Sequence, residues 1–187
     1  MKLLNVVIGI SGSRLSGKDT AALILQDLCG AKVTSLADPI KIQYADLMGI
    51  SLDTLYTQGI EKEKHRMGLI TLGAVRRSDN EDWWCEELHK THQNLSLVIP
   101  DIRFRNEVDY FTKNSKLFVL LEINSSYSTK VRRGWIPSVA DATTSETERQ
   151  SFASSINFSI DNDETLELLQ EKIRNVLYSL DLSYEKV

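Results

Sequence analysis

The stretch Gly12–Thr20 constrains this chain more than any other part of its sequence. It runs Gly-Ser-Arg-Leu-Ser-Gly-Lys-Asp-Thr, between an apolar run at Leu4–Ile10 and a segment with apolar residues at helical spacing, Lys18–Cys29. A strand buried on both faces produces such a run, and Gly30 is suited to end the helix that follows. We therefore expect a strand, a glycine-rich turn and a helix in succession.

In that context Gly-x-x-x-x-Gly-Lys is the pattern of a phosphate-binding loop, or P-loop. Glycines let the backbone curl so that successive N–H groups converge on phosphate oxygens. The helix that follows points its positive end at the same anion. Lys18 is expected to reach the β- and γ-phosphates of ATP as a compact cation. The residues expected to bind ATP in this loop are Gly12, Ser13, Ser16, Gly17, Lys18, Asp19 and Thr20.

Asp19 occupies the position at which P-loops usually place the Ser or Thr that ligates Mg²⁺. A carboxylate is still a hard oxygen ligand, and Thr20 adds a hydroxyl beside it. We therefore expect Mg²⁺ to accompany ATP, with Asp19 or Thr20 as its protein ligand.

Short apolar runs alternate with periodic segments along the rest of the chain, which predicts an α/β fold. We expect a single domain over 1–187, with a parallel sheet of about five strands and helices on both faces. Ligands of such sheets bind at the carboxyl ends of the strands. The other expected strands are Lys32–Leu36, Leu95–Ile99, Leu117–Glu122 and Phe158–Ile160, and the other expected helices are Ile40–Met48, Glu61–Val75, Trp83–Lys90, Arg103–Asn114 and Glu164–Leu180.

Several cations follow the expected strands or lie in the loop itself. Phosphoryl transfer spreads negative charge over the γ-phosphate oxygens, and guanidinium groups clamp such charge well. We therefore expect Arg14, Arg103 and Arg133 to act in catalysis together with Lys18. For Arg105 and Lys130 a functional role and a solvated surface position are equally plausible.

Two polar residues at strand ends have both a functional and a structural interpretation. Asp101 could orient a substrate or hold a Mg²⁺-bound water, or it could be a helix N-cap. Asn162 could contact adenine or simply form a turn. Trp83-Trp84 is expected to anchor a helix in the core. The three histidines, His65, His89 and His92, lack metal-like spacing and are expected at the surface.

Composition excludes several classes of protein. Of 187 residues 42% are hydrophobic and 26% charged, which is typical of a globular protein and not of a disordered one. The net charge of −4 argues against a nucleic-acid or anionic-membrane partner, and no apolar run approaches the ~18 residues of a membrane span. Cys29 and Cys85 are too few for a disulfide framework or zinc site. We expect a cytoplasmic monomer with reduced thiols.

With these features in place, the chain resembles the P-loop phosphomevalonate kinases of animals, which have the nucleoside-monophosphate-kinase fold. The resemblance covers nearly the whole chain, and the segment at 133–146 is its most specific part. The matching segments are Ser-Gly-Ser-Arg-Leu-Ser-Gly-Lys-Asp at 11–19, Asp-Pro-Ile-Lys…Tyr-Ala at 38–45, Glu-Lys-Glu-Lys-His-Arg at 61–66, Arg-Arg-Ser-Asp…Trp-Trp-Cys at 76–85, Asp-Ile-Arg at 101–103 and Arg-Gly-Trp-Ile-Pro-Ser-Val-Ala-Asp-Ala…Ser-Glu at 133–146.

This resemblance implies phosphorylation of 5-phosphomevalonate by ATP to give 5-diphosphomevalonate, a step of the mevalonate pathway that supplies isoprenoid and sterol precursors. It also implies a substrate-binding helical region at about 38–92 and a lid at about 124–150. The family's adenine-side asparagine falls on Asn162. The family's substrate and transition-state arginines fall on Arg77, Arg103 and, in the lid, Arg132 or Arg133. The residues that we expect to bind the substrate are Lys41, Arg76, Arg77, Asp101, Arg103 and Arg132.

The chain also departs from the family pattern, with Ser13, Leu15 and Phe104 where the family has cations. Two other functions therefore stay open at this point. One is a deoxynucleoside monophosphate kinase, which shares the loop and the Pro-Ile-Lys segment. The other is a nucleotide-binding module that has lost catalysis.

Overall fold

The sheet is built from five parallel strands in the order β2-β3-β1-β4-β5. This confirms the prediction of a parallel sheet of about five strands. The computed structural model describes residues 4–56, 60–136 and 148–182. The strands are β1 (Leu4–Ser11), β2 (Lys32–Val33), β3 (Leu97–Ile99), β4 (Ser115–Asn124) and β5 (Phe158–Asp161).

The chain divides into two compact units. The sheet unit comprises 2–34 and 94–187, and its helical elements are α1 (Lys18–Cys29), α6 (Arg105–Asn114), α7 (Tyr127–Arg132), the 3₁₀ segment η2 (Glu148–Ser155) and α9 (Leu166–Ser179). The helical unit, Ser35–Gln93, contains α2 (Ala37–Met48), α3 (Leu52–Tyr56), α4 (Ile60–Asp79) and α5 (Trp83–Thr91).

Alternate residues of the central strands pack on opposite faces of the sheet, as the two-residue period of a strand requires. Ile8 and Ile10 of β1 belong to the core formed with α1 and α9. On the other face Gly9 leaves room for the Ile102 and Phe118 side chains, which a Cβ would approach at 2.9 and 3.0 Å. Helix α6 covers this second face, where its Phe111 stacks on the Phe118 ring. Both faces are therefore covered by helices.

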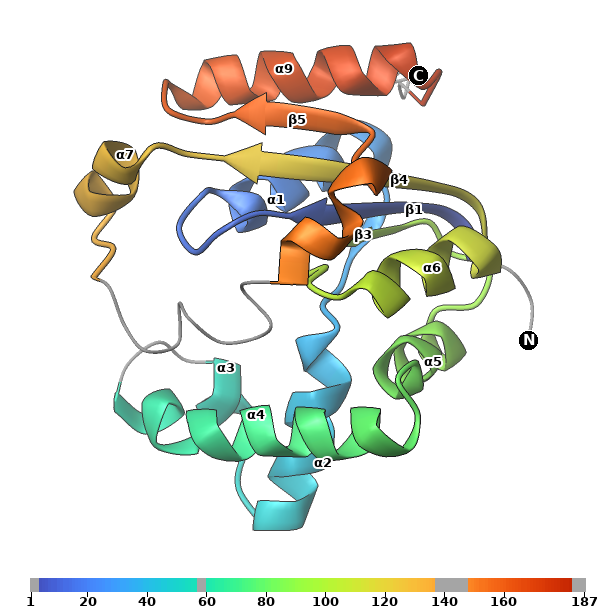
Figure 1. Cartoon of the computed structure of the whole chain (residues 1–187), viewed down its shortest axis with the longest axis vertical. Coiled ribbons are helices and arrows are strands. Elements are labelled where there is room, and N and C mark those ends of the chain that lie inside the picture. Colours follow the sequence, from blue (N-terminus) through green and yellow to red (C-terminus); the bar gives the residue numbers. More distant parts are fainter. Residues whose placement is uncertain (1–3, 57–59, 137–147, 183–187) are drawn as a thin grey trace. The chain divides into compact units, whose positions relative to one another are not determined.

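Parallel pairing brings the carboxyl ends of the strands to one edge of the sheet. Ser11 at the end of β1 pairs with Glu122, and Asn124 at the end of β4 pairs with Asp161. In Figure 1 the arrowheads of β4 and β5 point to the left, and the loop after β1 and helix α7 lie at that end. The loop that the sequence predicts to bind phosphate is thus at the ligand-binding edge of the sheet.

The helical unit packs around buried aromatic side chains. The Trp84 indole is buried and its Nε1–H donates to the Gly73 carbonyl at 3.1 Å, which confirms the expected anchor. His89, in contrast, is only 1% exposed, so the expectation of a surface residue was wrong. It belongs to the buried stripe of α5, with Trp84, Cys85 and Leu88, and this helical spacing was present in the sequence.

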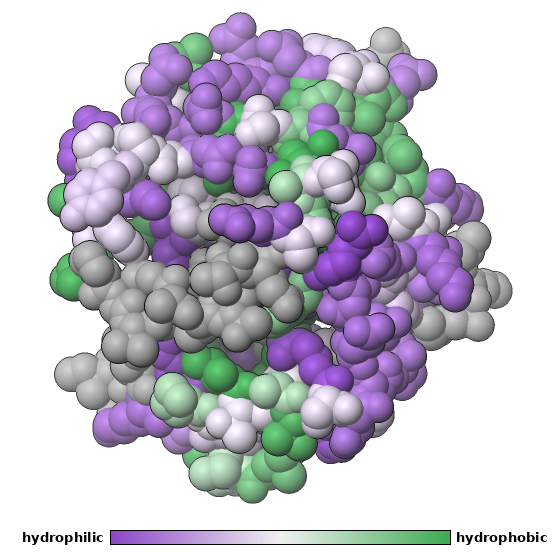
Figure 2. Space-filling model, viewed as in Figure 1, coloured by the Kyte–Doolittle hydropathy of each residue, from purple (hydrophilic) through white to green (hydrophobic). Residues whose placement is uncertain are grey.

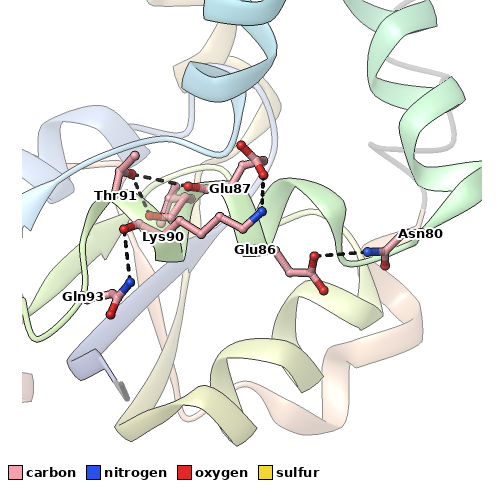
Figure 3. Close-up of polar contacts among 7 residues, drawn as sticks. Asn80, Glu86, Glu87, Lys90, Thr91 and Gln93 are labelled. Atoms are coloured by element: carbon pink, nitrogen blue, oxygen red, sulfur yellow. Dashed lines mark hydrogen bonds and ion pairs between the residues drawn. The ribbon is translucent and has the colours of Figure 1, made fainter. Parts of the chain in front are cut away.

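The surface of the helical unit carries both polar and apolar side chains. Polar contacts secure the surface of α5, where Lys90 pairs with Glu87 and Thr91 Oγ1 donates to the Leu88 carbonyl at 2.9 Å (Figure 3). Figure 2 shows hydrophobic surface over the region of α2 and α4, the helices labelled in Figure 1. Exposed apolar side chains of these helices are Ile42, Leu47, Met48, Met67, Ile70 and Val75.

Element boundaries differ from the predicted ones mainly at strand and helix ends. Strand β2 stops at Val33 instead of Leu36, and α4 continues to Asp79. Helix α6 begins at Arg105 instead of Arg103, which leaves Arg103 in the turn after β3. The short helices α3 and α7 were not predicted. Among the described residues, no helix is both long and apolar enough to span a membrane.

Candidate active site

The loop between β1 and α1 depends on two glycines that no other residue can replace without strain. Gly12 has φ +146° and Gly17 has φ +99°, in the region that L side chains rarely adopt. A Cβ on Gly12 would lie 2.3 Å from the Ile123 carbonyl oxygen, and one on Gly17 would lie 2.2 Å from Asn162 Nδ2. At Gly12 the neighbour is backbone, so no side chain fits there, whereas at Gly17 a side chain would strain the backbone and displace the Asn162 amide. This is the curled loop that the P-loop pattern predicts.

Lys18 begins α1 and its side chain folds back over the loop. Its Nζ donates to the carbonyls of Gly12 and Ser13, both at 2.8 Å. These bonds hold the ammonium above the curled backbone. Asp19 and Thr20 follow in the exposed first turn of the same helix.

The Ser16 carbonyl collects donors from three other segments of the sheet unit. Asn162 Nδ2 donates to it at 2.8 Å, Ser125 Oγ at 3.2 Å and Arg133 Nη1 at 3.2 Å. The Ser16 hydroxyl, in contrast, is fully buried and has no hydrogen-bond partner among the residues that the structure describes. Buried polar groups normally have a partner, so this hydroxyl is an exception within the loop.

Arg133 ties the segment after α7 to the loop and to the segment after β5. Besides its bond to Ser16, its Nη1 donates to the Leu15 carbonyl at 3.1 Å and to Ser125 Oγ at 2.9 Å. Its Nη2 donates to the Asn162 carbonyl at 2.8 Å. The guanidinium charge therefore lies directly beside the predicted phosphate-binding loop.

A cavity of about 350 Å³ opens beside this network. Leucine side chains supply apolar walls, Lys18 and Arg133 supply positive charge at the loop, and Asp19 and Glu164 add carboxylates. Such a mixture suits a ligand with a flat apolar part and an anionic part. The lining residues are Leu15, Gly17, Lys18, Asp19, Thr20, Arg133, Asn162, Glu164, Leu166 and Leu169.

Helix α7 and its flanks carry the other predicted cations of this segment. Arg132 is exposed and its Nη2 donates to Thr129 Oγ1 of its own helix at 2.8 Å. Lys130 Nζ lies 3.4 Å from Ser13 Oγ, so this lysine reaches the loop. Part of the predicted lid, residues 137–147, lies outside the described residues.

The amino end of α7 is anchored by Asp163. Its carboxylate accepts the Ser126 amide N–H at 2.7 Å. The pKa of Asp163 is lowered below its ordinary value, mainly by this bond. A hydrogen bond from the Thr129 hydroxyl and the nearby charge of Arg133 lower it further. The segment that carries Arg133 is therefore fixed to the segment after β5.

The turn after β3 is organised by Glu107, a residue that the sequence did not single out. Its buried carboxylate accepts the N–H groups of Arg103 at 2.7 Å and Phe104 at 3.0 Å. Phe104 is the N-cap of α6, so the alternative interpretation of Asp101 as an N-cap was wrong. Arg105 forms an ion pair with Asp109 on the helix surface at 2.9 Å. Of the two interpretations of Arg105, a functional role and a solvated surface position, this pair favours the second.

In the helical unit, the predicted substrate residues lie on α2 and α4. Arg76 Nε donates to Gln43 Oε1 at 3.0 Å, and its guanidinium carbon lies 4.9 Å from the centre of the Trp83 ring. Arg77 is half-buried near Gly73. Lys41 pairs with Asp38 at 3.3 Å.

The structure thus collects some predicted site residues in each unit. In the sheet unit the loop, Asn162 and Arg133 form one hydrogen-bonded network, whereas Arg132 bonds within its own helix. Arg14, Asp101 and Arg103 are half-buried in the same unit. Sequence reasoning missed Ser125, because a single Ser that bonds a distant backbone group leaves no spacing signal. It missed Glu107 although a Glu three residues after a helix N-cap is a signal, because the helix was expected to begin at Arg103.

No group of three or more His, Cys, Asp or Glu side chains that could hold a metal occurs among the described residues. Mg²⁺ does not need such a group, because it is commonly bound by one or two protein oxygens plus substrate phosphates and water. The Asp19 carboxylate and the Thr20 hydroxyl are exposed oxygen donors beside Lys18. They are therefore compatible with Mg²⁺ bound together with a nucleotide.

Comparison with known proteins gives a consistent result. Residues 10–117 match the family model described as phosphomevalonate kinase. A phosphomevalonate kinase of Drosophila melanogaster is 29% identical over 187 residues, covering 95% of this chain and 98% of that protein. A putative deoxynucleotide monophosphate kinase of Acanthamoeba polyphaga mimivirus is also 29% identical, but over 130 residues that cover 56% of this chain and 67% of the viral protein.

Solved structures share the architecture at low sequence identity. Shikimate kinase from Acinetobacter baumannii, solved in complex with shikimate, superposes with a TM-score of 0.53 at 13% identity and covers 96% of both chains. A likeness at this identity shows the fold alone. It confirms the predicted α/β P-loop kinase fold.

Proposed function

The chain belongs to the phosphomevalonate kinase family, and we propose that it transfers the γ-phosphoryl group of ATP to 5-phosphomevalonate, giving ADP and 5-diphosphomevalonate. The observation that carries the proposal is the Gly12–Thr20 loop with Lys18 folded over it, at the carboxyl edge of the sheet, in a chain that matches this family over most of its length. The relative of the competing class, the deoxynucleotide kinase, matches a shorter part of the chain.

The triphosphate is proposed to bind in the curl of the loop. Gly12 and Gly17 allow backbone N–H groups to face the phosphates, and the first turn of α1 adds its positive end. Lys18 already lies over the loop and supplies the charge for the β- and γ-phosphate oxygens. The cavity lined by Leu15, Leu166 and Leu169 supports placing the nucleoside there.

Asn162 is proposed to contribute to nucleotide binding mainly by holding the loop in shape. Its side-chain amide donates to the Ser16 carbonyl and lies against Gly17. It also lines the cavity. The contact with adenine that the sequence predicts for it stays a prediction.

Mg²⁺ is proposed to bind with ATP at Asp19 or Thr20. When bound, it neutralises charge on the phosphate oxygens and orients the leaving group. Lys18 and the arginines of the site supply positive charge from the protein side.

The acceptor carries a carboxylate and a phosphate, so it requires more cations than ATP alone. Lys41, Arg76 and Arg77 of the helical unit are proposed to bind these anionic groups, which guanidinium and ammonium groups recognise well. The remaining proposed substrate residues are Asp101, Arg103 and Arg132 of the sheet unit.

Catalysis is proposed to consist of positioning and charge stabilisation. The attacking oxygen belongs to a phosphate that is already ionised, so no general base has to remove a proton. Charge that develops on the transferred phosphoryl group is stabilised by preorganised cations. Lys18, Arg14, Arg103 and Arg133 are proposed for this role.

An acceptor assay tests the proposal. ADP release is measured with purified protein, ATP and Mg²⁺, and with phosphomevalonate or each deoxynucleoside monophosphate as acceptor in parallel. We expect turnover with phosphomevalonate alone. Turnover confined to a deoxynucleotide would replace this function with the competing one, and ATP binding without turnover of any acceptor would indicate a module without catalysis.

A further inference from the structure

Tyr56, at the carboxyl end of α3, contacts two residues of α2 that also contact each other. Its hydroxyl donates to Asp38 Oδ1 at 2.8 Å. Lys41 Nζ lies 3.3 Å from the same oxygen and 4.1 Å from the centre of the Tyr56 ring. The phenol, the carboxylate and the ammonium therefore form a closed set of three pairwise contacts within the helical unit.

The carboxylate in this set is fixed by the backbone. Asp38 lies in the first turn of α2. Its second oxygen, Oδ2, accepts the amide N–H of Ser35, which precedes the helix, at 3.0 Å. Asp38 Oδ1 is thus held in place, where it accepts both the Tyr56 hydroxyl and the Lys41 ammonium. The Tyr56 side chain is 48% exposed. Its partial burial, and then the hydrogen bond to Asp38 and the charge of Asp38, raise the pKa of the phenol, which stays protonated and keeps donating.

These contacts determine where the Lys41 ammonium lies. A lysine side chain has a flexible four-carbon stem and loses considerable rotamer freedom when it is held. The Lys41 side chain is only 14% exposed, and its charge rests on the face of an aromatic ring, where a cation is attracted. Because Tyr56 and the Ser35 amide also donate to Asp38, part of the negative charge beside Lys41 is already satisfied.

We propose that Tyr56 is a positioning residue that holds the Lys41 ammonium in the orientation in which it binds the anionic acceptor. The proposal rests on the proposed function, in which Lys41 binds phosphomevalonate. Tyr56 does not itself touch the acceptor in this account. Its ring supports the ammonium, and its hydroxyl fixes the carboxylate that pairs with it.

Two substitutions separate the ring from the hydroxyl. Tyr56→Phe keeps the ring under Lys41 and removes the donor to Asp38, whereas Tyr56→Leu removes both. We expect the KM for phosphomevalonate to rise by roughly threefold in Tyr56→Phe and on the order of tenfold in Tyr56→Leu. The KM for ATP is expected to stay unchanged in both variants, which a general loss of structure would not produce.

A double-mutant cycle with Lys41→Met identifies the residue through which Tyr56 acts. Groups that act as one unit are not additive, so Tyr56→Leu should add almost nothing once Lys41 is Met. Tyr178→Leu is the matched control, because Tyr178 is an exposed tyrosine of α9, 60% accessible. It should leave all kinetic constants unchanged, and thermal unfolding of every variant reports whether the fold is intact.

A second measurement needs no acceptor. In the NMR spectrum of the free protein, the Hε and Cε resonances of Lys41 should be shifted by the ring current of Tyr56. This shift should persist in Tyr56→Phe and disappear in Tyr56→Leu. If the wild type turns over phosphomevalonate but neither the KM nor the cycle responds to Tyr56, the positioning role is wrong and the function stands.

If the wild type does not turn over phosphomevalonate, the proposed function is wrong, and the NMR result then decides only whether Tyr56 holds the Lys41 ammonium in place. A Lys41 ring-current shift that Tyr56→Leu abolishes would support it. A Lys41 spectrum identical in wild type and Tyr56→Leu would overturn it.

Discussion

The Arg133 guanidinium donates to the main-chain carbonyl of Leu15, a residue whose backbone lies in the left-handed region at φ +58°. A non-glycine residue in this region is uncommon and strained. The same Nη1 also donates to the Ser16 carbonyl. Arg133 therefore stabilises the shape of the loop as well as supplying charge to it.

This relationship predicts that Arg133→Gln lowers both kcat and ATP affinity. Glutamine cannot reach the Leu15, Ser16 and Asn162 carbonyls together, so the loop loses its support and the site loses a charge. We expect kcat to fall on the order of 10²-fold and the KM for ATP to rise several-fold. Arg132→Gln is the matched control, because the Arg132 guanidinium donates to Thr129 of its own helix and lies outside the network around Ser16, so its effect on ATP should be small. A normal KM for ATP in Arg133→Gln would show that Arg133 does not support nucleotide binding and acts only by stabilising the transition state.

Gly17→Ala should abolish the folded loop. The new methyl group would lie 2.2 Å from Asn162 Nδ2, and φ +99° strains any L side chain. Gly49→Ala is a control with the same kind of strain, at φ +64°, but with no atom within 4 Å of the new Cβ. We expect Gly49→Ala to cost about 1–2 kcal/mol of unfolding free energy, whereas Gly17→Ala should also eliminate ATP binding in calorimetry. Equal ATP affinities would show that the close approach at Gly17 is not required.

Lys18→Met tests the loop lysine. Removing one preorganised charge typically costs ~10³-fold in rate, so we expect a loss of that order in kcat with the thermal unfolding midpoint nearly unchanged. The reason is that the Lys18 ammonium donates to the loop carbonyls of Gly12 and Ser13, so its removal alters the loop and leaves the packed core in place. A rate loss below about tenfold would mean that Lys18 does not stabilise the transferred phosphoryl group.

Asp163 gives a pH-dependent prediction. Its pKa is lowered in the folded protein by the Ser126 amide, the Thr129 hydroxyl and Arg133. A depressed folded pKa means that the carboxylate stabilises the folded state at neutral pH and that this contribution is lost as pH falls through the folded pKa. Carboxylate NMR titration should therefore show Asp163 titrating below an unfolded aspartate, and Asp163→Asn should shift the Ser126 amide resonance at pH 7 to its low-pH position. A titration at the ordinary aspartate pKa would contradict the anchoring of α7 by this residue.

Much of the fold could be predicted because its signals are local. The apolar run before Gly12 and the helical stripe of Lys18–Cys29 gave β1 and α1 with almost their observed bounds. The end of β2 could not be predicted, because it is set by its pairing with β3 and not by its own residues. His89 was expected at the surface because histidine is polar. Its helical spacing from Cys85 and Trp84 predicts instead that it lies on the buried face of α5.

The site could be predicted where a motif fixes it and not where tertiary hydrogen bonds do. Lys18 and its glycines follow from spacing alone. The bonds of Ser125, Arg133 and Asn162 to the Ser16 carbonyl join residues more than a hundred positions from the loop, and backbone acceptors carry no sequence signature. Glu107 was missed for a different reason. Its bonds to the Arg103 and Phe104 amides are local, but the helix was expected to begin at Arg103, which hid the place of Glu107 in the first turn of α6.

The most direct test of the account follows the phosphorus atoms themselves. In ³¹P NMR of protein with ATP, Mg²⁺ and phosphomevalonate, the account predicts that the acceptor's single phosphate resonance is replaced by the two coupled resonances of a diphosphate monoester while ADP accumulates. An acceptor resonance that stays unchanged while ATP is consumed to inorganic phosphate, or not consumed at all, would contradict it.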